Sequence, residues 1–160
     1  MNLPTSVIQR LQFLCRVTER ESKLLQQTSQ RLFVPVFSVD WVRQLDAQPE
    51  LGERVDAFVS RFGRLQDTLG DKLLPALLAA HGERVATVAD NLDKAERLGW
   101  VPSADNWFAM RALRNQMVHE YVEDPLVLFS ALQAGYGYLP DLLFAVEAMH
   151  SQARKRGWLT

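Results

Sequence analysis

Residues 51–69 read LGERVDAFVSRFGRLQDTL, and their apolar side chains recur at alternating steps of four and three residues. The apolar positions are Leu51, Val55, Phe58, Phe62, Leu65 and Leu69. This spacing places them on one face of an α-helix, as in helices that pack along their whole length against neighbours. The stretch therefore predicts a long amphipathic helix, and core packing is a sufficient role for its apolar face.

The sequence before this stretch predicts one more long helix and a connector. Val7, Leu11 and Leu14 begin an apolar face that continues to Leu32, with the polar segment 18–23 expected on the solvent side. Residues 33–37 read FVPVF, but the central proline argues against a strand inside a sheet. We expect 33–49 to form an extended connector, with its aromatic ends packed on the bundle, and a short helix.

The sequence after this stretch predicts that the helix is interrupted and that three more helices follow. Gly70 and Pro75 are expected to bend or break the long helix. The next helix is expected to end at Gly99, and the one after it to begin after a Ser103 cap. The last helix is expected to begin at an Asp124 cap. The predicted fold class is all-α, an up-and-down bundle of five or six helices, in one domain that spans residues 1–160.

Composition restricts the classes of function. The formal net charge is −1, which argues against coating nucleic acid by bulk electrostatics but not against a small cationic cleft. Cys15 is the only cysteine, so we expect an inert buried thiol and no disulfide. The histidines, His81, His119 and His150, have no metal-site spacing, and we expect no metal and no cofactor. With neither a signal peptide nor a membrane-length apolar run, the expected location is the cytoplasm.

The chemistry concentrates in residues 114–121, which read RNQMVHEY. Only here do a guanidinium, an imidazole and a phenol fall within eight residues. On a helix, Arg114 and Tyr121 lie inside an apolar arc formed by Trp107, Met110, Leu113, Met117 and Val118. A guanidinium in that position needs a carboxylate, a ligand phosphate or a cavity at a subunit boundary. The nearest carboxylates in sequence are Asp90 and Asp93.

His119 does not share the direction of Arg114 on a regular helix. Five residues of an ideal helix separate the two side chains by about 140°. They would converge if the helix frays before Pro125, or if two copies of the chain place their pairs in one cleft across a two-fold axis. The sequence leaves both routes open.

The segment resembles the extended signature of HEPN-domain proteins: Arg114, four residues, His119, one residue, Tyr121, with Asn115 directly after the arginine. The resemblance covers roughly residues 50–150 and implies a helical bundle. Similar proteins include metal-independent endoribonuclease toxins whose site forms at a homodimer interface. The resemblance implies phosphate binding by Arg114, proton transfer by His119 and substrate orientation by Asn115. Tyr121 resembles the position adenylylated by a minimal nucleotidyltransferase antitoxin.

This assignment is chemically reasonable, because RNA cleavage without a metal needs proton transfer and positive charge at the phosphate. Two other readings stay open. The chain is then either a non-catalytic HEPN-like binding subunit that partners a nucleotidyltransferase, or a structural dimer in which Arg114 pairs with an acidic residue. Glu120 and Asp124 oppose the ribonuclease reading, because anions near the site repel RNA.

Overall fold

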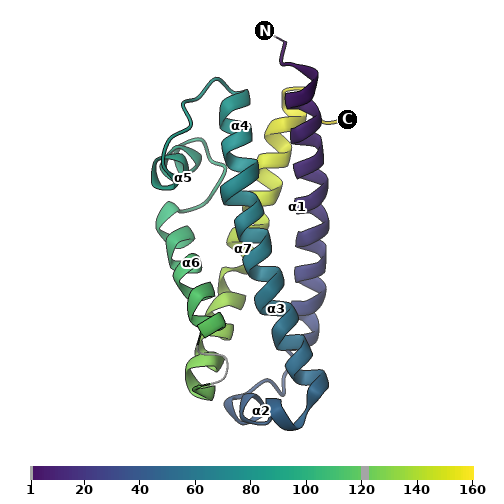
Figure 1. Cartoon of the computed structure of the whole chain (residues 1–160), viewed down its shortest axis with the longest axis vertical. Coiled ribbons are helices and arrows are strands. Elements are labelled where there is room, and N and C mark those ends of the chain that lie inside the picture. Colours follow the sequence, from purple (N-terminus) through teal and green to yellow (C-terminus); the bar gives the residue numbers. More distant parts are fainter. Residues whose placement is uncertain (1, 120–122) are drawn as a thin grey trace.

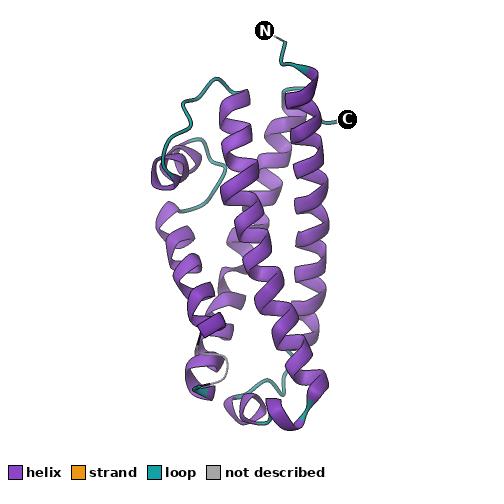
Figure 2. Ribbon diagram, viewed as in Figure 1, coloured by secondary structure: helices purple, strands orange, loops and turns teal. Residues whose placement is uncertain are grey.

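The structure, a computed structural model, describes residues 2–119 and 123–160, and these contain helices and loops but no strand (Figure 2). The predicted all-α fold class is confirmed. The elements are α1 (Thr5–Leu32), α2 (Val39–Arg43), the 3₁₀ turn η1 (Leu45–Ala47), α3 (Pro49–Asp67), the π-helical segment η2 (Thr68–Leu73), α4 (Leu74–Ala80), α5 (Val88–Arg97), α6 (Ala104–His119) and α7 (Pro125–Lys155). With α3, η2 and α4 taken as one continuous rod, these described residues form six helices.

Four long helical rods run alternately down and up the molecule (Figure 1). α1 descends, α3 and α4 return, α6 descends beside them, and α7 returns to the end where the chain began. α3 packs on α1 and α6, and α7 packs on the same two helices. The chain ends meet at one end of the bundle, where the Gln12 side chain donates a hydrogen bond to the Trp158 carbonyl oxygen at 3.1 Å.

The apolar stripe of residues 51–69 forms the centre of the core, as predicted. All six of its apolar side chains are at most 3% exposed. Fully buried leucines of α1 and α7, among them Leu11, Leu25 and Leu142, belong to the same contiguous cluster. Burial of a large apolar side chain stabilises a fold by about 1.5–3 kcal/mol, so this stripe is the main source of stability that the sequence specifies.

Gly70 and Pro75 were expected to bend or break the helix, and no break occurs, since α3, η2 and α4 follow one another without a gap. The chain widens into a π turn over Thr68–Leu73, in which the Leu74 N–H donates to the Leu69 carbonyl, five residues back. A proline inside a regular helix clashes with the carbonyl group four residues earlier. The wider π turn shifts that carbonyl group relative to the proline ring and so avoids the clash. Gly70 has a separate role, because an added Cβ there would meet the Trp107 indole at 3.0 Å.

Most of the predicted helix ends are confirmed, but the connector is not extended, because the Phe37 N–H donates to the Val34 carbonyl oxygen at 2.9 Å and closes a turn. Phe33 packs against Phe58, and Phe37 against Phe129, so the segment's aromatic ends do lie on the bundle. The predicted caps at Ser103 and Asp124 form, with the Ser103 hydroxyl accepting from the Asn106 N–H and the Asp124 carboxylate from the Leu126 N–H. The Ser38 hydroxyl likewise accepts from the Trp41 N–H at the start of α2. Gly82 and Gly99 have positive φ angles after their helices, as glycine caps require. Within the described residues we find no helix that combines the length and the apolarity of a membrane span.

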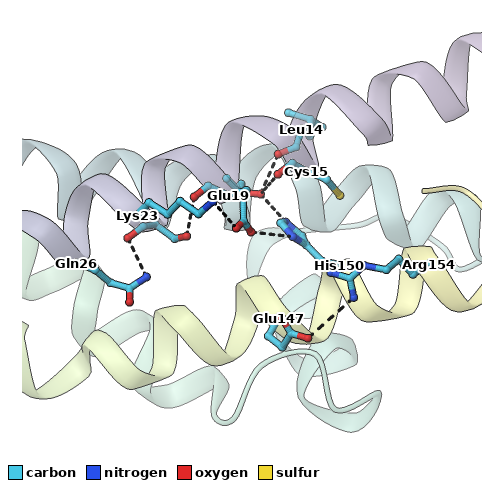
Figure 3. A network of polar contacts seen from close by, with 10 residues as sticks. Leu14, Cys15, Glu19, Lys23, Gln26, Glu147, His150 and Arg154 are labelled. Atoms are coloured by element: carbon cyan, nitrogen blue, oxygen red, sulfur yellow. Dashed lines mark hydrogen bonds and ion pairs between the residues drawn. The ribbon is translucent and has the colours of Figure 1, made fainter. Parts of the chain in front are cut away.

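The polar segment 18–23 of α1 is not a solvated face throughout, which corrects the sequence-based expectation. Thr18 is fully buried, and its hydroxyl donates to the Leu14 carbonyl oxygen at 2.9 Å. The Thr18 hydroxyl oxygen also forms a 2.8 Å hydrogen bond with Nε2 of buried His150 on α7, while the His150 Nδ1 lies 3.7 Å from the Glu19 carboxylate (Figure 3). These residues form a polar contact between α1 and α7 that helical periodicity does not reveal. Cys15 nearby is buried, and burial raises the pKa of its thiol to about 11, so it is inert as expected.

His150 makes stability depend on pH. Burial lowers the pKa of its imidazole from the ordinary 6.5, with Arg154 adding to this and Glu19 and Glu147 opposing it. The unfolded chain therefore takes up the proton first, and this contribution to stability is lost as pH falls below about 6.5. Burial also lowers the pKa of His81.

We expect the free energy of unfolding to fall more steeply between pH 7.5 and pH 5 in the unmodified chain than in His150→Gln. Glutamine retains a donor for Thr18 but does not titrate. Urea denaturation at several pH values measures the difference, and His81→Gln reports the part that His81 contributes. Equal slopes for the unmodified chain and His150→Gln would contradict this account.

Candidate functional site

Helix α6 carries the motif and stays regular through His119. Trp107, Met110 and Met117 are fully buried and fix the helix against α3 and α7. Val118, which the apolar arc was expected to include, is 55% exposed because α6 has neighbours on only part of its circumference. The helix does not fray before His119, so within these residues the divergence of Arg114 and His119 is retained.

Arg114 turns toward α3 and forms an ion pair there. Its Nη1 donates to Oδ1 of Asp67 at 2.6 Å, and each side chain is about one third exposed. The nearest acids in sequence, Asp90 and Asp93, are exposed on α5 and are not its partners, which corrects that suggestion. The side of α6 that bears Arg114 lies against α3, and only the packing of the helices reveals this.

A second arginine of α6 forms a similar ion pair. Nη2 of Arg111 donates to Oδ1 of Asp71 at 2.8 Å. The two arginines are three residues apart and the two aspartates four, so both pairs span the same interhelical seam. Partly exposed pairs of this kind are each worth about 0.2–1 kcal/mol, a small addition to the buried apolar contacts of α6.

Gly63 of α3 leaves the space in which the Arg114 side chain lies. A Cβ added at Gly63 would stand 2.5 Å from Arg114 Nε and 3.1 Å from its Cδ. The guanidinium therefore crosses α3 directly over bare backbone. Any other residue at this position would push the arginine out of its place.

An open pocket of about 780 Å³ lies between α3 and α6. Its lining residues are Asp56, Val59, Ser60, Arg64, Asp67, Thr68, Asp71, Lys72, Arg114, Met117 and Val118. Three cations and three carboxylates line it, so its charge is balanced, and a phosphate entering it would compete with Asp67 for Arg114.

Glu21 of α1 lies behind this pocket. Its Oε1 is 3.2 Å from the Thr68 hydroxyl, and its Oε2 is buried and has no hydrogen-bond partner among the described residues. Burial raises the pKa of this carboxyl, whereas the bond to Thr68 and the charges of Arg64 and Lys72 lower it. Glu21 thus brings a fourth carboxyl group close to the pocket wall.

His119 and Asn115 lie on a different side of α6. Both are exposed, neither lines the pocket, and no hydrogen bond from residues 2–119 or 123–160 reaches either side chain. They continue a stripe that begins with exposed Phe108 and Ala112, at steps of four, three and four residues. We call these four residues the α6 stripe. Tyr121 lies outside the described residues.

The structure thus brings Arg114 into a pocket but does not bring it together with His119 in one chain. The residues that sequence reasoning missed are Asp67, Asp71, Arg64 and Lys72. A signal was present, because Asp67 and Asp71 at one-turn spacing match Arg111 and Arg114, yet nothing in the sequence indicates which helices face each other. Among the described residues, no group of three His, Cys, Asp or Glu side chains is placed to hold a metal ion.

Fold and site together define an all-α bundle with an arginine-containing groove on one flank and a histidine-bearing stripe beside it. Comparison with protein-family models, with curated proteins and with solved structures finds no match to this chain.

We expect Gly63→Ala to lower stability by about 1 kcal/mol, because the new methyl group displaces Arg114 from Asp67. The same substitution in an Arg114→Ala background should cost much less, since the atoms it would strike are gone. A double-mutant cycle measured by urea denaturation checks this. If the stability losses of the two single variants add up to that of the double variant, Gly63 has a role other than making room for Arg114.

Proposed function

We propose that this chain is a metal-independent endoribonuclease in which Arg114 and His119 act in a cleft completed by a second copy of the chain. One observation carries the proposal: Arg114 is held in an open pocket while His119 and Asn115 stand unpartnered within the described structure on the same helix. The sequence resemblance to HEPN-domain proteins supports it.

Arg114 suits phosphate binding despite its ion pair. A guanidinium has five N–H donors, and Asp67 accepts from one of them at 2.6 Å. The pair is partly exposed and therefore weak, whereas a phosphate accepts two parallel bonds from the arginine fork. In this proposal Asp67 holds the Arg114 side chain in position over Gly63 when no RNA is bound.

His119 suits the proton transfers. An exposed imidazole near the end of α6 is free to approach a ribose 2′-hydroxyl or the leaving oxygen. Asn115 stands one turn before it on the α6 stripe, where its amide reaches the same substrate. In this assignment neither residue has a competing structural role, since both are solvent-exposed.

A second copy of the chain supplies what one copy lacks. The stripe that bears His119 also bears Phe108, which is 39% exposed, and small Ala112. A large apolar side chain beside a small one is suited to close packing of two helices about a two-fold axis. Such packing brings two histidines into one cleft, and a substrate that extends from this cleft around α6 would reach the arginine of each copy, about 140° away on its helix.

The proposed partners are this second copy, an RNA substrate and a minimal nucleotidyltransferase antitoxin that modifies Tyr121. Adding nucleotide phosphates next to the cleft would block RNA by charge and bulk. The competing function is a non-catalytic subunit that presents substrate to a nucleotidyltransferase. The Arg114–Asp67 pair is the observation that favours it, because this ion pair already accounts for the motif arginine within one chain.

Cleavage of cellular RNA by the purified protein in excess EDTA tests the activity. We expect cleavage, and a loss of at least about a hundredfold in Arg114→Ala and in His119→Ala, because one loses phosphate stabilisation and the other proton transfer. Arg111→Gln is the matched control, since it removes a neighbouring arginine that also pairs with an aspartate, and it should keep its activity.

Absence of cleavage by the folded, unmodified protein would reject the ribonuclease. Cleavage that persists in His119→Ala would reject the assigned site. With no activity in a folded dimer, the binding-subunit function becomes the better reading, and co-purification with a nucleotidyltransferase tests it.

Phe108→Glu should convert the proposed dimer to a monomer and abolish cleavage, because a carboxylate would then be buried at the α6 stripe. Phe144→Glu is the matched control, because Phe144 is an exposed phenylalanine on another helix, α7, with 47% exposure against 39% for Phe108. Sedimentation velocity gives the mass of each variant. A Phe108→Glu protein that remains dimeric would exclude the α6 stripe as the interface.

A further inference from the structure

A second cavity lies on the other flank of α3, between that helix and α1. Its volume is about 340 Å³, near the lower end of the range of about 300–1,000 Å³ for small-molecule sites. Its lining residues are Thr28, Arg31, Glu50, Glu53, Arg54, Ala57 and Arg61. Three arginines therefore meet in one small space, and none of them belongs to the motif helix.

Arg61 is fixed in place at the wall of this cavity. Its Nη1 donates to the Thr28 hydroxyl at 2.5 Å and to the Leu24 carbonyl oxygen at 3.3 Å. Thr28 is 5% exposed, and its own proton is donated to Leu24, so its oxygen is free to accept from Arg61. Two bonds from one nitrogen hold the guanidinium and leave its other donors for a ligand.

Arg54 has no such partners among the residues that the structure describes. Its Nε is buried and, among the described residues, has no hydrogen-bond acceptor. No carboxylate in the described part of the chain lies within ion-pair distance of Arg54, Arg61 or Arg31, although Glu50 and Glu53 line the same cavity. A shielded guanidinium N–H without an acceptor is costly, so Arg54 gains hydrogen bonds by turning its guanidinium toward an anion in the cavity.

The charges also favour an anion. Three arginines outnumber the two glutamates, and the glutamates are exposed, so water and salt screen them. Arg54 and Arg61 are half-buried, where their attraction for an anion is less screened. Arginine forks match the oxygens of a tetrahedral phosphate group in geometry as well as in charge.

We propose that this cavity, lined by Arg31, Arg54 and Arg61, is a binding site for a phosphate group. The phosphate belongs either to a polynucleotide that crosses α3 or to a small phosphorylated ligand. Arg61 is the fixed donor, Arg54 gains the acceptor that it lacks, and Arg31 closes the outer side. The site lies apart from the Arg114 pocket and does not depend on the proposed ribonuclease activity.

A titration with inorganic phosphate, followed by NMR of the arginine Nε–H signals, tests the site. The Arg54 and Arg61 signals should shift and saturate, and Arg54→Gln should weaken binding by about tenfold or more, the value of a charge-assisted bond. Glu53→Gln should tighten binding because it removes a repelling charge. Neither substitution breaks a described contact of the fold, so both variants should fold.

Arg97→Gln is the matched control, because Arg97 is an exposed arginine on α5 and its loss changes the net charge by the same amount as Arg54→Gln. It should leave phosphate affinity unchanged. Arginine signals that do not respond to phosphate, or equal weakening by Arg54→Gln and Arg97→Gln, would overturn the proposal.

A parallel titration with a single-stranded RNA oligonucleotide, in a His119→Ala background that does not cut it, identifies the source of the phosphate. If Arg54→Gln weakens both ligands, the site serves a polynucleotide. If it weakens phosphate alone, the site serves a small ligand. Both results support the phosphate site, and neither depends on cleavage, so a failed ribonuclease test leaves this one intact.

Discussion

The fold depends on one constraint, the burial of the apolar stripe along the α3 rod. The side chains from Leu51 to Leu69 are almost completely buried, and the rod continues through the π turn into α4 without a break. Once this face is buried, the flanks of α3 can only face its neighbours. One flank carries Arg54 and Arg61 toward α1, and the other carries Asp67 toward α6. Both cavities are therefore consequences of how one helix is packed.

The motif arginine illustrates how a structural contact and a site share the same atoms. Arg114 joins α6 to α3 through Asp67, and the absence of a side chain at Gly63 is what permits it to lie there. A single bond to a carboxylate that is about one third exposed positions the guanidinium without using up its donors. The opposite outcome, a fully buried arginine with several partners, would have left nothing for a phosphate. His119, on the α6 stripe, has no such tie within the described structure, and its role is open to a second copy of the chain.

The sequence predicted most elements of the fold, because the determinants of those elements are local. Helical periodicity, the caps at Ser38, Ser103 and Asp124, and the glycines after two helices depend on residues a few positions apart. The break expected at Pro75 was wrong because a π turn can accommodate a proline that would clash inside a regular helix. Thr18 was misjudged because its partner, His150, is 132 residues away in the sequence. Asp67 was not identified as the partner of Arg114 for the same reason.

By itself, the sequence determined the all-α class, most of the helix ends and the chemical repertoire of residues 114–121, since each follows from residue type and short-range spacing. Only the tertiary structure decided which flank of α3 faces α6, which carboxylate Arg114 meets, and that Arg54 and Arg61 converge with Arg31 across two helices. These facts depend on how long rods rotate about their axes when they pack. Rotation is set by the sum of many side-chain contacts along each rod, and no local pattern encodes it.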